Sequence, residues 1–134
     1  MKATAGSVLL WASTAGVVML VAGCHRQSVP AEPQFVCSVD LSGVTVHRYN
    51  GSGSTVTIPN VLYGVPVRCI GTGAFKSCLR LAHVTIPNGV STVHDVAFAY
   101  CTNLASITVP DSVSDIGIGA FEHCYSLTSV TIPT

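Results

Sequence analysis

Six cysteines and five histidines are the residues of this 134-residue chain whose types could hold a metal ion or act as nucleophiles. Three of the cysteines, Cys78, Cys101 and Cys124, recur at one fixed interval. No pair of histidines or cysteines has a ligand spacing such as H-x₃-H or C-x₂-C. We therefore expect no metal site and no cofactor. The histidines are His25, His47, His83, His94 and His123.

The same residues argue against catalysis. Cysteine–histidine chemistry requires a thiolate beside a base in a cleft, whereas cysteines that recur at a fixed spacing indicate packing positions. The chain lacks a phosphate-binding loop, and Gly71-x-Gly73 lacks the third glycine of a dinucleotide-binding motif. We predict that the protein is not an enzyme and has no small-molecule substrate.

The N-terminal segment has the pattern of an export signal. A basic Met1-Lys2 pair is followed by an uncharged apolar stretch from Ser7 to Gly23. Val21-Ala22-Gly23-Cys24 resembles the lipobox of bacterial lipoproteins, which predicts a signal peptide over residues 1–23, cleavage before Cys24 and a lipid on its thiol. An uncleaved membrane anchor and ordinary signal cleavage remain as alternatives. Residues 24–34 then form a polar, proline-containing tether that reaches at most ~35 Å.

Charge is sparse in the predicted mature chain. After residues 1–23 it carries five lysine or arginine residues against six aspartate or glutamate residues, without clustering along the sequence. Nucleic-acid binding normally needs a basic stripe, so we expect no nucleic-acid partner. Electrostatic steering is also not expected to dominate the choice of partner.

The second half of the chain consists of repeats of equal length, as the positions of Phe75, Phe98 and Phe121 indicate. Each unit has a phenylalanine, a cysteine, a leucine, a Val/Ile-Thr-Val/Ile strand pattern and a proline at fixed positions. The alternating residues predict a short strand with its threonine directed outward, and the proline ends that strand. Stacked units place like residues on one another, so we expect a buried core of Phe75, Phe98, Phe121, Cys78, Cys101, Cys124, Leu81, Leu104 and Leu127.

This pattern resembles the BspA-type leucine-rich repeat, with Ala97-Phe98, Cys101, Leu104 and Ile107-Thr108-Val109-Pro110 as its clearest copy. The resemblance covers about residues 56–134. It implies a leucine-rich repeat solenoid with a short curved parallel β-sheet, an N-terminal β-hairpin-like cap and few or no α-helices. It also implies a role on bacterial surfaces, as an adhesin or a binder of host proteins.

We divide the remaining chain into residues 35–74, an N-terminal cap and irregular first coil, and residues 75–134, the repeats (75–97, 98–120 and an incomplete 121–134). Five extra residues around Tyr63-Gly64-Val65-Pro66 predict a bulging loop in the first coil. The incomplete last unit leaves an open strand edge, which favours a truncated or shortened member of a longer array over one whose edge a partner covers. The three repeat cysteines are expected to be reduced, while a Cys37–Cys69 disulfide remains open.

The function that we predict is noncovalent binding of a protein, a cell-surface component or an extracellular-matrix component. The chain would be lipid-anchored in the bacterial cell envelope, at the outer surface or in the periplasm. The alternative is a structural or vestigial lipoprotein without a specific ligand. Candidate contact residues lie on loops and on the outward strand face: Tyr63, Tyr49, Arg68, Lys76, Arg80, Tyr100, His83, Thr85 and Thr108.

Overall fold

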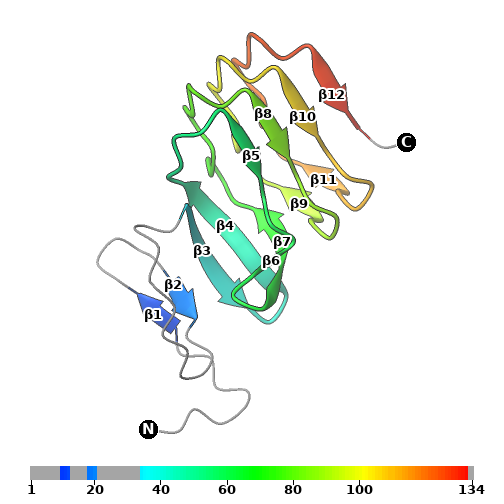
Figure 1. Ribbon diagram of the computed structural model, residues 1–134. Helices are drawn as coiled ribbons and strands as arrows, with labels where there is room; N and C mark the ends of the chain where they lie inside the picture. Colours follow the sequence, from blue (N-terminus) through cyan, green and yellow to red (C-terminus); the bar gives the residue numbers. More distant parts are fainter. Residues whose placement is uncertain (1–9, 13–17, 21–33, 133–134) are drawn as a thin grey trace, which may run out of the picture.

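The computed structural model describes residues 10–12, 18–20 and 34–132 of the chain (Figure 1). Two short strands, β1 (Leu10–Ala12) and β2 (Val18–Leu20), pair antiparallel. The predicted lipidation site Cys24 lies outside the described residues, as does nearly all of the predicted tether. Within the described part of the chain, no helix is long and apolar enough to cross a membrane.

Residues 34–132 form a β-solenoid of about four turns, without a helix among the described residues, as the repeat pattern predicts. The first of its two sheets has the strand order β12-β10-β8-β5, and all neighbours are parallel. Its central residues align in one register row, Val56, Val84, Ile107 and Val130. These strands are β5 (Thr55–Thr57), β8 (His83–Thr85), β10 (Ser106–Thr108) and β12 (Ser129–Thr131).

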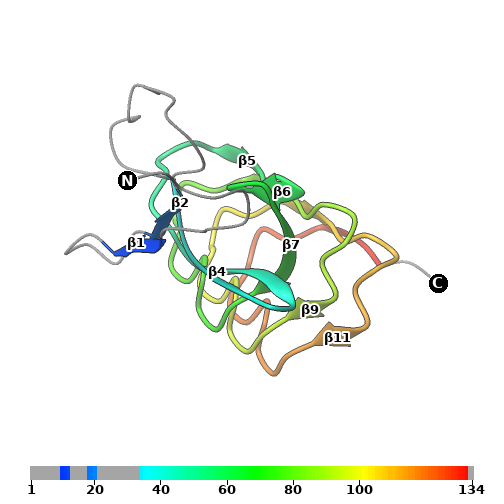
Figure 2. The same ribbon diagram turned by 90° about the horizontal axis from the view of Figure 1, so that it is seen from below.

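The return segments of the coils form a second sheet, which the repeat pattern did not predict. Its order is β11-β9-β7-β4-β3, of which Figure 2 labels β11, β9, β7 and β4. Along this order only the β3–β4 pair is antiparallel, and β6 (Val61–Leu62) joins the sheet off this path as an antiparallel partner of β7. That pair is the expected hairpin cap. The strands are β3 (Phe35–Asp40), β4 (Gly43–Tyr49), β7 (Val65–Ile70), β9 (Thr92–Val93) and β11 (Asp115–Ile116).

The extra residues of the first coil are more regular than predicted. Instead of a bulging loop, β6 (Val61–Leu62) pairs antiparallel with the start of β7 in a tight hairpin. Tyr63 and Gly64 form its two-residue turn, with φ angles of 55° and 80°. A two-residue hairpin of this kind requires positive φ at both positions, and glycine supplies one of them without strain.

An aromatic column runs through the solenoid beside the two sheets. Phe75 and Phe98 are fully buried, with ring centroids 4.8 Å apart, and Phe121 stacks 5.6 Å from Phe98. Tyr49 continues the column at 5.2 Å from Phe75, and Phe35 covers Tyr49 at 5.5 Å. The cap therefore closes the column with its own aromatic side chains.

Tyr49 is the first coil's counterpart of the repeat phenylalanine. Its amide donates to the Ala74 carbonyl at 2.8 Å, just as the Phe75 amide donates to Ala97 at 2.7 Å and the Phe98 amide to Ala120 at 2.8 Å. The sequence pattern hid this equivalence because the interval from Tyr49 to Phe75 is longer than the interval from Phe75 to Phe98.

The repeat cysteines are held by bonds between coils. The Cys101 thiol donates to the Phe75 carbonyl at 3.0 Å, and the Cys124 thiol to the Phe98 carbonyl at 3.1 Å. Cys101 is fully buried, whereas Cys78 and Cys124 are half-buried at the two ends of their row. The Cys101 and Cys124 thiols thus bond to the backbone one coil back.

The structure decides against the Cys37–Cys69 disulfide. Both thiols are free, and β4 lies between the strands that carry them. Two strand spacings separate their Cα atoms by about 10 Å, beyond the ~7 Å that a disulfide permits. Cys37 pairs with Val46 and is buried, while Cys69 pairs with Thr45, whose side chain is on the opposite face of β4.

Candidate functional site

Each coil presents three surfaces that a partner could contact. The strand face is the outer face of β5, β8, β10 and β12. The corner edge consists of the links from the first sheet to the second, residues 58–66, 86–91 and 109–114. The return edge consists of the links back to the first sheet, residues 71–82, 94–105 and 117–128, on the opposite side of the coils (Figure 1).

The strand face is a regular array of small polar side chains. His83, Thr85 and Thr108 are exposed there, and His83 Nδ1 shares a hydrogen bond of 2.7 Å with Ser106 Oγ. The described strands of this face carry no tyrosine, tryptophan or arginine. Because interface anchors are mostly of those three types, this face offers a partner few anchoring side chains.

Two of the predicted contact residues lie at or beside the corner edge, Tyr63 within it and Arg68 on the adjoining strand β7. Arg68 is exposed and donates to the Gly89 carbonyl at 3.1 Å, so its guanidinium already has a partner. Tyr63 lies in the β6–β7 turn but is only half-exposed, and it packs against the core. Burial raises the pKa of its hydroxyl, and proximity to Cys37 adds to that effect. Its ring thus supports the hairpin and presents only part of its surface.

Tyr49 is a correction to the predicted contact residues. Its side chain is 8% exposed because the ring is a member of the aromatic column. Burial raises the pKa of its hydroxyl, so the group stays protonated. The predicted set is therefore divided among the strand face, the corner edge, the core and the return edge, where Tyr100 lies.

The return edge carries an exposed aromatic ridge, which we define as Tyr100, His123 and Tyr125. The Tyr100 and His123 rings are stacked with centroids 4.5 Å apart, and Tyr125 meets His123 edge-on at 5.5 Å. Tyr125 is 77% exposed and Tyr100 42%. His123 and Tyr125 were not among the contact residues predicted from the sequence, although His123 occupies in its repeat the position that Tyr100 has in the preceding one.

Backbone geometry fixes the ridge. Tyr100 and His123 have φ angles of 62° and 58°, in the left-handed region that only single residues normally adopt. The amide of Tyr100 donates to the Glu122 carbonyl of the next coil at 2.8 Å. His123 bonds through Nδ1 to the Tyr125 hydroxyl at 2.6 Å, and its Nε2 lies 3.3 Å from a Glu122 carboxylate oxygen. The three rings are thus held in place without a ligand.

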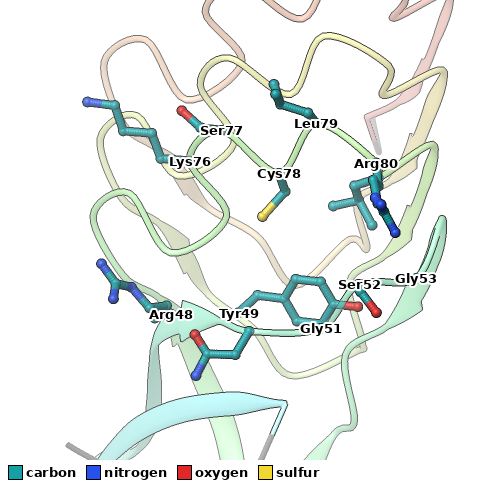
Figure 3. A pocket seen from close by; sticks show the side chains of 12 residues that line it. Arg48, Tyr49, Gly51, Ser52, Gly53, Lys76, Ser77, Cys78, Leu79 and Arg80 are labelled. Carbon is teal, nitrogen blue, oxygen red and sulfur yellow. The ribbon is translucent and has the colours of Figure 1, made fainter. Parts of the chain in front are cut away.

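A pocket opens next to the ridge, between the β4–β5 loop and the turn that follows Phe75 (Figure 3). Its volume is about 440 Å³. Lys76 belongs to both features, because its Nζ lies 5.8 Å from the centre of the Tyr100 ring. The pocket is lined by Arg48, Tyr49, Asn50, Gly51, Ser52, Gly53, Lys76, Ser77, Cys78, Leu79, Arg80 and Leu81.

The pocket thiol differs from the next thiol in the row. Interaction with the neighbouring Cys101 thiol lowers the pKa of Cys78, while interaction with the Cys78 thiol and burial raise the pKa of Cys101. Figure 3 shows the Cys78 sulfur directed toward the Tyr49 ring. No group of three or more histidine, cysteine or acidic residues in the described ranges could hold a metal ion.

The model of the BspA-type leucine-rich repeat region matches residues 49–134 in six copies. The chain belongs to this family. The match begins at Tyr49, the residue that starts the aromatic column in the first coil. Leucine-rich repeat proteins of this kind are typically non-enzymatic binding scaffolds, and they generally bind proteins.

Crystal structures of bacterial leucine-rich repeat proteins have the same fold. One, from T. pallidum, is 34% identical with a TM-score of 0.73, over 75% of this chain and 48% of the other. Another, from Bacteroides ovatus, is 30% identical with a TM-score of 0.69, over 77% of this chain and 29% of the other.

A structure from Bacteroides capillosus shares the fold at 20% identity, with a TM-score of 0.57, over 81% of this chain and all of the other. The chain thus spans about half the length of the T. pallidum protein and less of the B. ovatus protein. A comparison with curated protein sequences gave no match.

Proposed function

We propose that this chain is an exported, lipid-anchored protein of the bacterial cell envelope that binds a protein partner noncovalently through its return edge. The observation that carries the proposal is the aromatic ridge of Tyr100, His123 and Tyr125, exposed and fixed by stacking and hydrogen bonds. Tyrosine is a frequent interface anchor, and side chains ordered before binding lose little entropy when a partner docks.

The export and anchoring part of the proposal is supported by the Val21-to-Cys24 pattern after an uncharged segment. Its test is the intact mass of the protein extracted from membranes. The mass should show the loss of residues 1–23 and the gain of acyl chains on Cys24. A mature mass that retains Met1 would contradict it.

If the ridge binds a protein partner, the strength of binding should depend on how many copies of the chain are presented together. A ridge of three rings is smaller than the ~800 Å² that each side of a standard interface buries, so one copy should bind weakly. Many copies side by side on a membrane gain by avidity. The full chain immobilised at high density should retain a protein from a panel of purified extracellular-matrix and envelope proteins, whereas the free chain should hold that protein poorly.

Paired variants test whether the ridge makes the contact. Tyr100→Ala combined with Tyr125→Ala should reduce retention about ten-fold or more, typical of the loss of two anchors. Thr108→Ala on the strand face should leave retention unchanged. If the double variant and Thr108→Ala retain the partner equally well, the ridge is not part of the interface. If the immobilised chain retains no protein of the panel, the structural or vestigial alternative holds.

A further inference from the structure

The pocket beside the ridge gathers most of the positive charge of the solenoid. Residues 34–132 contain four lysine or arginine side chains, and three of them, Arg48, Lys76 and Arg80, line this pocket. No aspartate or glutamate is among its lining residues. The sequence suggested unclustered charge, and the structure corrects this: the fold brings together cations from two separate segments of the chain.

None of the three pocket cations has an acidic partner within the described ranges. The single ion pair there is His123 with Glu122, and no hydrogen bond joins Arg48, Lys76 or Arg80 to another described group. Arg68, the fourth cation, donates to the Gly89 carbonyl. Like charges without counter-charges repel one another, so an anion that enters the pocket relieves this repulsion and gains hydrogen bonds.

The β4–β5 loop forms one wall of the pocket. Gly51 lies so close to the Tyr49 ring that a Cβ there would collide with the ring. The loop can therefore lie flat on the tyrosine only with glycine at this position. The Gly51 and Ser52 amides donate to no acceptor within the described part of the chain. Unpaired amides of a glycine-containing loop are suited to anionic oxygen atoms.

The arrangement of the cations determines the shape of ligand that fits. Figure 3 shows Arg48 and Lys76 on one side of the Tyr49 ring and Arg80 on the other, beside Ser52. Leu79, which is 54% exposed, and Leu81 supply apolar surface among them. A single small anion would fill only a part of about 440 Å³. The site matches an extended ligand with acidic groups at its ends and an apolar group between them.

We propose that this pocket binds an acidic peptide segment of a protein partner, with its carboxylates paired to Arg48 and Lys76 at one end and to Arg80 at the other. Arginine pairs with carboxylates through two parallel hydrogen bonds, which favours a defined peptide over diffuse counter-ions. The choice of a peptide as the ligand class rests on the proposed function, whereas the anion preference rests on the pocket alone.

The test is fluorescence anisotropy with the full chain and a labelled peptide, Glu-Glu-Gly-Leu-Gly-Glu-Glu. The acidic peptide should bind about ten-fold tighter or more than the same peptide with glutamine for glutamate. Its affinity should fall with added salt, because exposed charge pairs are screened. Equal affinity for the two peptides, or no binding of either, would overturn the proposal.

Variants locate the binding. Arg48→Gln combined with Arg80→Gln removes two exposed charges and should weaken the acidic peptide about ten-fold or more. Arg68→Gln, on β7 and outside the pocket lining, is the matched control and should bind as the unaltered chain does. Thermal melting followed by circular dichroism verifies that each variant is folded. Undiminished binding by the double variant would place the peptide elsewhere and reject the pocket.

Further measurements distinguish a peptide from other anionic ligands, and distinguish the pocket proposal from the proposed function. Inorganic phosphate should compete only weakly, and a sulfated polysaccharide that binds where the acidic peptide does not would overturn the peptide assignment. The Tyr100→Ala, Tyr125→Ala variant should still bind the free peptide. If the peptide binds in the pocket but the immobilised chain retains no protein, the pocket inference stands and the proposed function fails.

Discussion

The middle of the aromatic column and its C-terminal end both carry a phenylalanine at the same repeat position, but the two rings differ in how they are covered. Phe98 has a stacked ring on both sides and is fully buried. Phe121 stacks on Phe98 alone and is half-buried. In a solenoid each coil contacts only its neighbours, so equal sequence positions can contribute unequally to stability.

The N-terminal end shows how a coil is covered. Tyr49 and Phe35 extend the column into the cap, and both are 8% exposed. At the other end of the described chain, Ile118 is 85% exposed, Ile132 60% and Val130 38%. The cap thus covers the apolar side chains at the N-terminal end of the solenoid, whereas no described residue covers those of the last coil.

The largest expected effect is that of truncating the middle ring. Phe98→Ala should lower the free energy of unfolding by about 3–5 kcal/mol, because the cavity lies between two stacked rings that cannot collapse into it. Phe121→Ala should cost less than half as much, since part of its ring already faces solvent. Urea unfolding measures both. Equal losses would mean that the coils do not differ in the way their burial indicates.

The cysteine row should show the same contrast in reactivity. Cys101 is fully buried and its pKa is raised, so its thiolate is scarce, whereas Cys78 is half-exposed with a lowered pKa. A thiol reagent at neutral pH should modify Cys78 well before Cys101, because the thiolate is the reacting form. Mass spectrometry of the native protein at successive times gives the order. Simultaneous modification of both would mean that the coil opens as a unit on the labelling timescale.

The smallest expected effect concerns the turn of the middle coil. Val96 has a φ of 49°, where Gly73 and Gly119 of the neighbouring coils have 64° and 63°. A β-branched residue is strained there, so Val96→Gly should raise the free energy of unfolding by about 0.5–1 kcal/mol. Val113→Gly, at a position without positive φ, is the control and should be destabilising. A destabilised Val96→Gly would show that the packing of this valine outweighs its strain.

Much of the fold was predictable because the repeat is a strict pattern. The constant repeat length predicted the parallel register of β8, β10 and β12, and the Val-Thr-Ile alternation predicted the outward threonines. The tight β6–β7 hairpin was missed because its turn begins with tyrosine. Tyrosine gives no sign of a positive φ, which Asn-Gly or Gly-Gly would have indicated.

The candidate site was far less predictable. Tyr49 is of a residue type that is common in interfaces, but it lies in the core because it takes the place of the repeat phenylalanine. Tyr125 was missed because it lies outside the repeat pattern, and only the local turn brings its ring edge-on to His123, while the stacking of coils adds Tyr100 on the other side. Residue type alone cannot separate a tyrosine that fills a core from one that faces a partner.

The sequence by itself determined the solenoid, since each coil buries its apolar face only against a neighbour and the constant repeat length fixes which residues meet. It also determined the outward hydroxyl rows, because side chains alternate between the two faces of a strand. Only the tertiary structure decided that the return segments form a second sheet and that the Tyr49 ring closes the core. It alone decided that Arg48, Lys76 and Arg80 share one pocket, because the neighbours of an exposed cation depend on how coils of unequal length are stacked.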